Sequence, residues 1–332
     1  MRNFIILIFI LITSSLNANE WEDRQVFSSG ETTQSLKILS STDTTFFAPI
    51  IKSFLEKNPN IKVEYFVTGT ASLDKIFRKS PEQYDLIISS AMDLQLKLVN
   101  DGYAKKINEI EHPSWAKWRQ SLFAFTIEPA AIVLNKKAFK NTIIPKTRQD
   151  LIKELRSKPT FFKNKIGTYD VRKSGLGYLF ATQDARTSET FWRLMEVMGG
   201  LGTKLYCCSG DMIDDLASGK IAVAYNVLGS YAEARKQKSD EIEIILPADF
   251  PTNMMRTALV SNLTSRIRLS ERFMQHLLEN QTEVKVNGTH SLPPLFLKPG
   301  QQTIILEPAL MTYLDKLKRK TFIKEWERAI IQ

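Results

Sequence analysis

Small hydroxyl side chains stand just before several predicted helices, and they are the clearest candidates for binding chemistry in this sequence. They are Ser41, Thr42, Ser89, Ser90 and Ser174. A hydroxyl at this position caps a helix by accepting a backbone N–H, and capping alone explains any one of them. With the free N–H groups of a helix start, a hydroxyl can also hold an oxyanion. The set therefore predicts a site for a small polar ligand, with an anion favoured.

The same loops carry further candidates for ligand contact. Asp43, Tyr169, Asp170, Tyr225 and Asn226 can bind ligand hydroxyls, whereas Gly69, Thr70 and Gly175 are small enough to let the backbone approach a ligand. Arg119, Arg172 and Lys173 can pair with a carboxylate or phosphate. Plain surface charge explains each of these three cations as well or better. The expected site is a set of loops and not a catalytic constellation.

One pattern of catalytic residues needs weighing against binding. Ser72-Leu73-Asp74-Lys75 matches the S-x-x-K pattern of penicillin-recognising serine enzymes, and Lys173-Ser174-Gly175 resembles their K-[ST]-G pattern. No S-x-N stands between the two, and Lys173 falls in a predicted loop where that chemistry needs a strand. We therefore expect no enzyme and no cofactor.

The cysteines and histidines give no metal-ligand spacing. Cys207 and Cys208 are adjacent, and His112, His276 and His290 lie far apart in the sequence. We expect no metal site. Adjacent cysteines can be bridged only through a strained eight-membered ring, and a pair of small buried side chains is an equally good interpretation, so their redox state stays open.

The first eighteen residues have the organisation of a secretory signal. Arg2 is followed by nine apolar residues, 4–12, and by a small polar segment that ends at Ala18. Nine residues are too few to cross about 30 Å of hydrocarbon. We predict that residues 1–18 are a cleaved signal peptide and that the product is periplasmic.

Composition excludes several classes of protein. The chain has 332 residues, 43% of them hydrophobic and 24% charged, which suggests two soluble domains. Its net charge of +9 is densest at residues 316–324, where lysines flank apolar residues at helical spacing. This pattern is typical of a solvated helix face, so we expect no nucleic-acid partner; the positive surface can attract an anionic solute.

The candidate loops lie in an alternation of strands and helices. After a polar segment to Gln34, strands are expected at 36–39, 61–67 and 86–88, each followed by a helix. A second series, with helices at 148–156 and 211–217 and strands at 165–168 and 221–225, precedes a return strand at 242–246. The alternation predicts an α/β fold with two lobes: residues 35–130 plus 247–332, and residues 131–246. Ligands bind beyond the carboxyl ends of parallel strands, so the loops should face a cleft between the lobes.

Residues 84–104 resemble a family of bacterial periplasmic solute-binding proteins that is grouped with ferric-iron and sugar-phosphate uptake systems. Three further stretches share the resemblance, at 167–170, 224–232 and 313–319. The resemblance implies a type II periplasmic binding fold that closes on a solute and docks, as a monomer, on an inner-membrane ABC permease. In some relatives the partner is instead a sensor kinase, and the sequence does not separate the two.

The resemblance also bears on the ligand. Ferric-binding members carry adjacent tyrosines shortly after the asparagine equivalent to Asn226, where this chain has Val227-Leu228-Gly229, and it has no adjacent tyrosines anywhere. A phosphorylated or carboxylated metabolite is therefore the expected ligand, in preference to iron.

Overall fold

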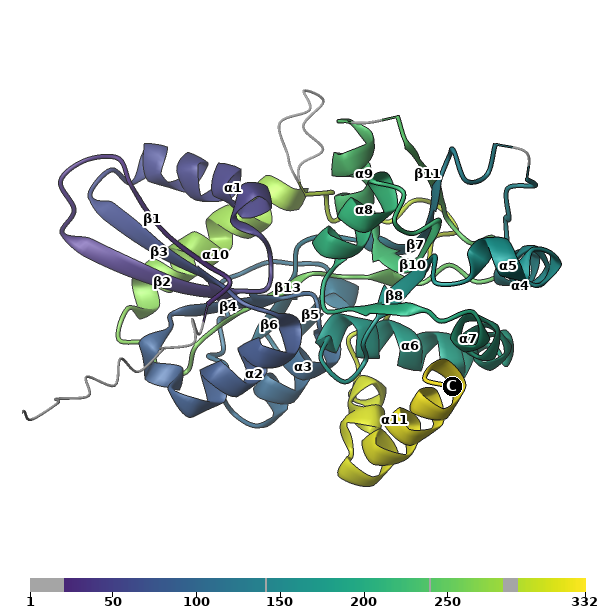
Figure 1. Cartoon of the computed structure of the whole chain (residues 1–332). Coiled ribbons are helices and arrows are strands. Elements are labelled where there is room, and N and C mark those ends of the chain that lie inside the picture. Colours follow the sequence, from purple (N-terminus) through teal and green to yellow (C-terminus); the bar gives the residue numbers. More distant parts are fainter. Residues whose placement is uncertain (1–20, 141, 239, 283–291) are drawn as a thin grey trace, which may run out of the picture.

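The computed structural model describes residues 21–140, 142–238, 240–282 and 292–332. The predicted signal peptide lies outside these residues. The described chain forms two lobes, each built on a mixed β-sheet with helices around it (Figure 1). Among these residues, no helix has the length and apolarity that crossing a membrane requires.

Lobe 1 is built on a seven-stranded sheet. Its strand order is β1 (Asp23–Ser28), β3 (Ile61–Val67), β2 (Gln34–Ser40), β4 (Leu86–Ser89), β13 (Thr257–Val260), β6 (Leu122–Ala124) and β5 (Lys117–Trp118). Strand β2 runs parallel to both β3 and β4. The apolar residues of β4 are fully buried, as expected for a central parallel strand.

A helix follows each of these parallel strands. They are α1 (Thr44–Lys57), α2 (Thr70–Lys79) and α3 (Met92–Asn100), and α10 (Ile267–Thr282) packs beside α1. Phe47, Ile51 and Phe54 recur at helical spacing in α1 and are fully buried in the lobe 1 core. Because parallel strands end at one edge of the sheet, the three helix starts gather at that edge.

Strand β1 differs from the sequence prediction of a polar segment up to Gln34. It pairs antiparallel with β3, with Gln25 opposite Tyr65. Most of its side chains are exposed, so it has no apolar run that marks a strand. Backbone pairing at the sheet edge holds it, and this pairing brings Glu22 and Asp23 to the end of the strand nearest lobe 2.

Lobe 2 is built on a second sheet, of six strands. Strands β11 (Ile242–Ile245), β7 (Glu128–Asn135), β10 (Val223–Leu228), β8 (Ile166–Tyr169) and β9 (Lys204–Tyr206) follow in that order, and β12 (Asn253–Met254) also pairs with β7. Its helices are α4 (Arg148–Ser157), α5 (Pro159–Phe162), α6 (Gly175–Thr187), α7 (Thr190–Gly200), α8 (Ser209–Ala217) and α9 (Gly229–Lys236). Helices α6 and α8 start after the parallel strands β8 and β9, so their starts share one edge.

Two of the chain segments that cross between the lobes pair with each other. One runs from β6 into β7 and the other from β12 into β13, and they pair where Asn253 faces Pro129 and Met254 faces Glu128. The first sheet takes its strands from residues 23–124 and 257–260, and the second from residues 128–254.

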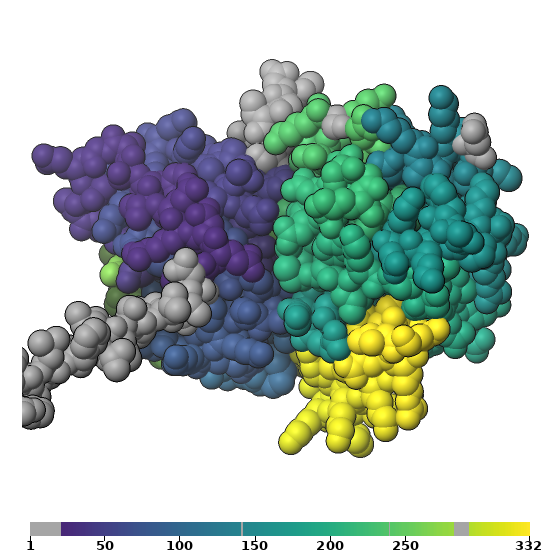
Figure 2. Space-filling model, viewed as in Figure 1, coloured from purple at the N-terminus to yellow at the C-terminus, as the bar shows by residue number. Residues whose placement is uncertain are grey.

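The C-terminal helix α11 (Lys316–Ile330) packs on lobe 2, whereas the sequence prediction gave all of residues 247–332 to lobe 1. Trp326 and Ile330 join the lobe 2 core, and a side chain at Gly199 of α7 would meet the Ala329 carbonyl oxygen at 2.1 Å. In Figure 2 the yellow C-terminal segment lies against the teal lobe. Helical periodicity identifies which face of a helix is buried, but not the lobe that buries it.

Candidate ligand-binding site

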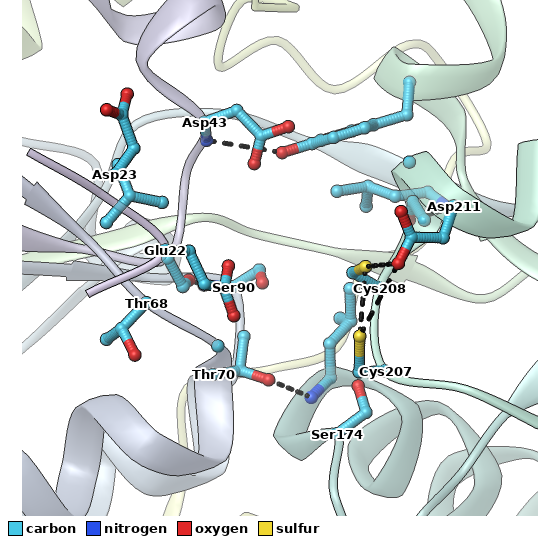
Figure 3. A pocket seen from close by; sticks show the side chains of 18 of the residues that line it. Glu22, Asp23, Asp43, Thr68, Thr70, Ser90, Ser174, Cys207, Cys208 and Asp211 are labelled. Atoms are coloured by element: carbon cyan, nitrogen blue, oxygen red, sulfur yellow. Dashed lines mark hydrogen bonds between the residues drawn. The ribbon is translucent and has the colours of Figure 1, made fainter. Parts of the chain in front are cut away.

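A cavity of about 570 Å³ lies between the lobes, within the size range of small-molecule sites. Its wall comes from both lobes. On one side lie residues 22, 23, 25, 41, 43–45, 67–70 and 90, and on the other lie 169, 174, 176, 207–211, 228 and 231, with Arg256 from a crossing segment. Figure 3 shows Glu22 and Ser90 on the lobe 1 side, facing Cys208 and Asp211 on the lobe 2 side.

The cavity lies where helices start. Helices α1, α2 and α3 begin at its lobe 1 wall, and α6, α8 and α9 begin at its lobe 2 wall. This follows from the parallel pairing in each sheet, which ends the strands at a common edge.

The lobes touch each other at the cavity. The Thr70 hydroxyl oxygen of lobe 1 accepts hydrogen bonds from the Gly175 N–H (2.8 Å) and the Leu176 N–H (3.1 Å) at the start of α6. The Asp43 N–H donates to the Tyr231 hydroxyl (3.4 Å), and the rings of Phe46 and Tyr231 pack with centroids 4.5 Å apart. These contacts join the lobes around the space that a ligand would fill.

Several residues that the sequence analysis selected line this cavity. They are Ser41, Asp43, Gly69, Thr70, Ser90, Tyr169 and Ser174. The Ser41 hydroxyl donates to Ser89 Oγ (3.2 Å) and accepts from the Ser90 N–H (3.3 Å), so it joins the ends of two neighbouring strands. Ser174 caps α6 by accepting the Gly177 N–H (3.0 Å).

The structure places the other selected residues outside the cavity wall. Thr42 is fully buried, and its hydroxyl accepts a hydrogen bond from Arg256 Nη1 at 2.6 Å. Ser89 is buried at the end of β4, where its hydroxyl accepts the Ala91 N–H. Gly175 gives its N–H to Thr70. These groups hold the loops in place instead of facing a ligand.

Asp170, Tyr225 and Asn226 also have partners within lobe 2. The carboxylate of Asp170 binds the Arg172 guanidinium through both oxygens, at 2.8 Å each. Tyr225 and Asn226 both donate to Asp184, at 2.7 and 2.9 Å. Asn226 has a φ of 63° at an irregularity in the pairing of β10, which turns its side chain into the lobe.

The cations that the sequence analysis offered for an anionic ligand do not line the cavity. Arg119 stacks on Trp118, and Arg172 pairs with Asp170 and Glu327. Lys173 is exposed outside the cavity wall. Among the described residues, the one cation in the wall is Arg256.

Arg256 is already neutralised inside the protein. Its Nε and Nη2 atoms donate to the two carboxylate oxygens of Glu128, at 3.0 and 3.2 Å, and both side chains are completely buried. The Glu128 carboxylate also accepts hydrogen bonds from Ser230 and Thr126. This pair ties the two crossing segments together.

Carboxylates dominate the charge of the cavity wall. They are Glu22, Asp23, Asp43 and Asp211. Loss of hydration, then repulsion from Asp43 and Asp211, raises the pKa of Glu22. Loss of hydration also raises the pKa of Asp43, and repulsion from Asp211 and Asp23 adds to the rise. A hydrogen bond with Tyr231 and the positive charge of Arg256 oppose it. Asp211, on the opposite wall, therefore contributes to raising the pKa of both carboxyl groups.

The sequence analysis selected Asp43 but missed the other three acids. Glu22 and Asp23 fell in a segment that showed no strand pattern, and Asp211 stands in the first turn of α8, where an acidic residue is ordinary. The useful signal was the alternation of acids with hydroxyls and glycines at Ser209-Gly210-Asp211, which marks another small-residue loop that enters a helix.

The cysteine pair lies in the cavity wall. Cys207 is exposed and Cys208 partly exposed, contrary to the interpretation as buried side chains. Their Sγ atoms are 3.2 Å apart, and Cys208 Sγ is 3.2 Å from Asp211 Oδ2 (Figure 3). The two thiols and this carboxylate lie close enough to bind one metal ion, a grouping that sequence spacing did not indicate. Loss of hydration and contact with Cys207 raise the pKa of Cys208, which favours its neutral thiol.

The residues of the serine-enzyme pattern do not have the placement that this chemistry needs. Ser72 and Lys75 lie on α2, and Lys173 precedes the start of α6, away from any strand. Ser174 Oγ is occupied as the cap of α6. This arrangement does not match the strand-borne lysine that the chemistry needs.

A family model described as bacterial extracellular solute-binding protein matches residues 40–252. A crystal structure of the substrate binding protein of an ABC transporter from Agrobacterium tumefaciens is similar along nearly the whole chain. The identity is 30%, the TM-score is 0.86, and the match covers 93% of this chain and 98% of the other. The chain belongs to the bacterial extracellular solute-binding proteins.

Other solved structures share the fold at lower identity. The periplasmic binding protein AfuA from Actinobacillus pleuropneumoniae, with fructose-6-phosphate bound, is 15% identical with a TM-score of 0.71, over 90% of this chain and 99% of the other. A ferric binding protein from Campylobacter jejuni is 17% identical with a TM-score of 0.63, over 89% and 97%. No curated protein sequence matches this chain significantly.

The expected fold class is therefore established: two α/β lobes in the periplasmic solute-binding arrangement. The family consists of extracellular binding proteins, typically periplasmic, which supports a binding role for this chain in place of a catalytic one.

Proposed function

We propose that this solute-binding protein captures a small polar solute in the cavity between its lobes and delivers it to an inner-membrane ABC permease. The observation that supports the proposal is the cavity itself, whose wall combines hydroxyls, carboxylates and helix starts from both lobes. A solute that touches both walls binds the closed arrangement more tightly than an open one, and so shifts the population towards closure.

The proposed ligand contacts are the selected residues that line the cavity, together with Glu22, Ser209 and Asp211. Thr70 has a distinct role in the proposal. Its hydroxyl bridges from α2 to the start of α6, so it stabilises closure whether or not it touches the solute.

A phosphorylated or carboxylated metabolite is a second candidate for the solute. We carry this candidate over from the resemblance that the sequence analysis drew, which for phosphoglycerate transport regulatory proteins implies a phosphorylated solute. The hydroxyl-rich helix starts at the cavity favour an anion. Against an anion stand the carboxylates of the wall and the internal pairing of Arg256.

A thermal-shift screen tests the proposal. The protein, purified from the periplasm of an expression host, is heated with 3-phosphoglycerate, glucose 6-phosphate, citrate, ferric citrate, putrescine, spermidine, arginine, choline and zinc chloride. A solute at 100 times its Kd adds about 2.7 kcal/mol to the free energy of unfolding, which raises the melting temperature measurably. If neither this panel nor a small-molecule extract of the periplasm raises it, the proposed capture function fails.

A further inference from the structure

We propose that the solute is a small organic cation, whose ammonium or guanidinium group lies among Glu22, Asp43 and Asp211. This inference rests on the proposed function and deepens it by naming the substrate class. The location of the site, in the cavity between the lobes, is supported by the geometry of the cavity and by the family. The carboxylates add the charge of the solute.

The charges of the cavity wall carry the inference. Four carboxylates line the wall, and the single guanidinium in the described part of it is neutralised by Glu128. The chain as a whole has a net charge of +9, so the sign of the charge on the cavity wall is opposite to that of the molecule. A wall that concentrates negative charge in a positively charged protein attracts a cation and repels an anion.

The positive ends of helices reduce this charge without cancelling it. Six helices start at the cavity, and each start carries roughly half a positive charge, or about +3 in all. Against these partial charges, the same wall holds four carboxyl groups, Glu22, Asp23, Asp43 and Asp211. The first amides of α6 are in addition already bound by Thr70 and Ser174. The balance at the cavity therefore stays negative.

The carboxylates also come from opposite walls and lie close enough to influence one another. Glu22 and Asp43 belong to lobe 1 and Asp211 to lobe 2, and the charge of Asp211 contributes to raising the pKa of each of the other two. When the lobes close, this repulsion opposes closure. A cation placed among the three groups removes the repulsion, so the binding of a cation and the closing of the lobes favour each other.

The size of the cavity and its aromatic wall favour an organic cation over a bare metal ion. A volume of about 570 Å³ accommodates a molecule, whereas one ion would leave most of it unfilled. Tyr231 contributes an aromatic side chain next to Asp43, and Tyr169 contributes another on the lobe 2 side. Aromatic faces beside carboxylates suit alkylammonium groups.

The test is isothermal titration calorimetry with putrescine, spermidine, arginine and choline as cationic probes, and with 3-phosphoglycerate and zinc chloride as the alternatives. The protein is compared with Asp43→Asn, Asp211→Asn and the control Glu56→Gln, which removes an exposed acid of α1 outside the cavity. We expect at least one organic cation to bind. Asp43→Asn and Asp211→Asn should each weaken it about tenfold or more, because each removes a charge-assisted contact. Glu56→Gln should stay within about twofold, as surface changes usually do.

Four outcomes would overturn the inference. They are binding of 3-phosphoglycerate with no organic cation bound, binding of zinc alone, equal weakening in Glu56→Gln, and cation affinity unchanged in both cavity variants. Affinity for 3-phosphoglycerate that rises in Asp43→Asn would leave the capture function standing with an anionic solute. The absence of every response, by contrast, would count against the capture function itself. The melting temperature of each variant shows whether weaker binding comes from a lost contact or from a less stable fold.

Discussion

Two groups of charged side chains in this protein have opposite surroundings. In the core of lobe 2, Arg148 and Asp184 are completely buried and pair at 3.2 Å. Asp184 also accepts hydrogen bonds from Tyr225, Asn226 and Thr252, so its oxygens have full partners. In the cavity wall, Glu22, Asp43 and Asp211 are exposed to solvent, and within the described part of the chain no Lys or Arg forms an ion pair with them.

The buried pair stabilises the fold, whereas the carboxylates of the cavity wall remain available to a ligand. Arg148 and Asp184 tie α4 and α6 to the irregular end of β10, and nothing of them faces the cavity. On balance, the surroundings of Glu22 and Asp43 disfavour their ionised forms, because loss of hydration and repulsion from nearby acids raise their pKa values. A protein retains such groups at a cost in stability when a ligand compensates them.

The largest expected effect comes from breaking the buried pair. Arg148→Met leaves the Asp184 carboxylate buried without its cation and should lower the free energy of unfolding by about 3–5 kcal/mol. Urea unfolding measures this, with Lys153→Met on the exposed face of the same helix as the matched control. A loss below about 1 kcal/mol in Arg148→Met would remove the distinction between the two groups.

The second effect concerns the contact that joins the lobes. Thr70→Val removes the acceptor of two N–H groups at the start of α6 and should weaken solute binding about tenfold, at about 0.5–1.5 kcal/mol per hydrogen bond. Affinity by calorimetry and the radius of gyration by X-ray scattering measure the change. Ser72→Ala, at an exposed position on the same helix, serves as the control. Equal affinities in Thr70→Val and Ser72→Ala would exclude this role for Thr70.

The third effect is a dependence on pH that belongs to the cavity. Because the pKa values of Glu22 and Asp43 are raised in the folded protein, these groups ionise above their ordinary range. Affinity for an organic cation should rise as pH increases through the raised pKa values. Over the same interval the unliganded protein should lose stability, since its folded state binds these protons more tightly than the unfolded chain.

Asp43→Asn supplies the check on this pH dependence. The groups that act on Asp43 are Tyr231 and Arg256, which lower its pKa, and Asp211 and Asp23, which raise it. The variant should show a shallower rise of affinity with pH. A slope equal to that of the unmodified protein, measured by calorimetry between pH 4 and 8, would place the titrating group elsewhere.

The smallest expected effect tests whether a bound solute covers the cysteine pair. Cys207 is exposed at the cavity, so a bound solute should slow its alkylation by iodoacetamide under reducing conditions, by about two- to tenfold if occupancy follows mass action. Mass spectrometry of the digested protein follows the modification. Alkylation at the same rate with and without saturating solute would mean that the solute does not cover this part of the wall.

The regular parts of the fold could be predicted because burial imposes a pattern on the sequence. The apolar strand at residues 86–88 and the spaced aromatics of α1 identify a parallel sheet with helices after its strands. The edge strand β1 and the lobe that receives α11 depend on backbone pairing and on the close approach at Gly199, and neither has a local pattern.

The candidate site was predicted only as a set of loops. Hydroxyls before helices look alike in a sequence, yet Ser90 faces the cavity while Thr42 is bound by Arg256 inside the protein. The partner of a polar side chain is commonly far away in the chain, as Asp184 is for Asn226. The charge of the cavity depends on which acids meet across the lobes, and this is a property of the folded arrangement.

The most direct measurement is a carbon-13 NMR titration of the Asp and Glu carboxyl groups in the unliganded protein, with and without Asp211→Asn. The pKa values of Asp43 and Glu22 should lie above those of the same residues in an unstructured peptide, and both should fall when Asp211 is neutralised. Values at or below the ordinary ones, unmoved by Asp211→Asn, would mean that a cation already compensates these acids. That result would contradict the proposal that the cavity binds a positively charged solute.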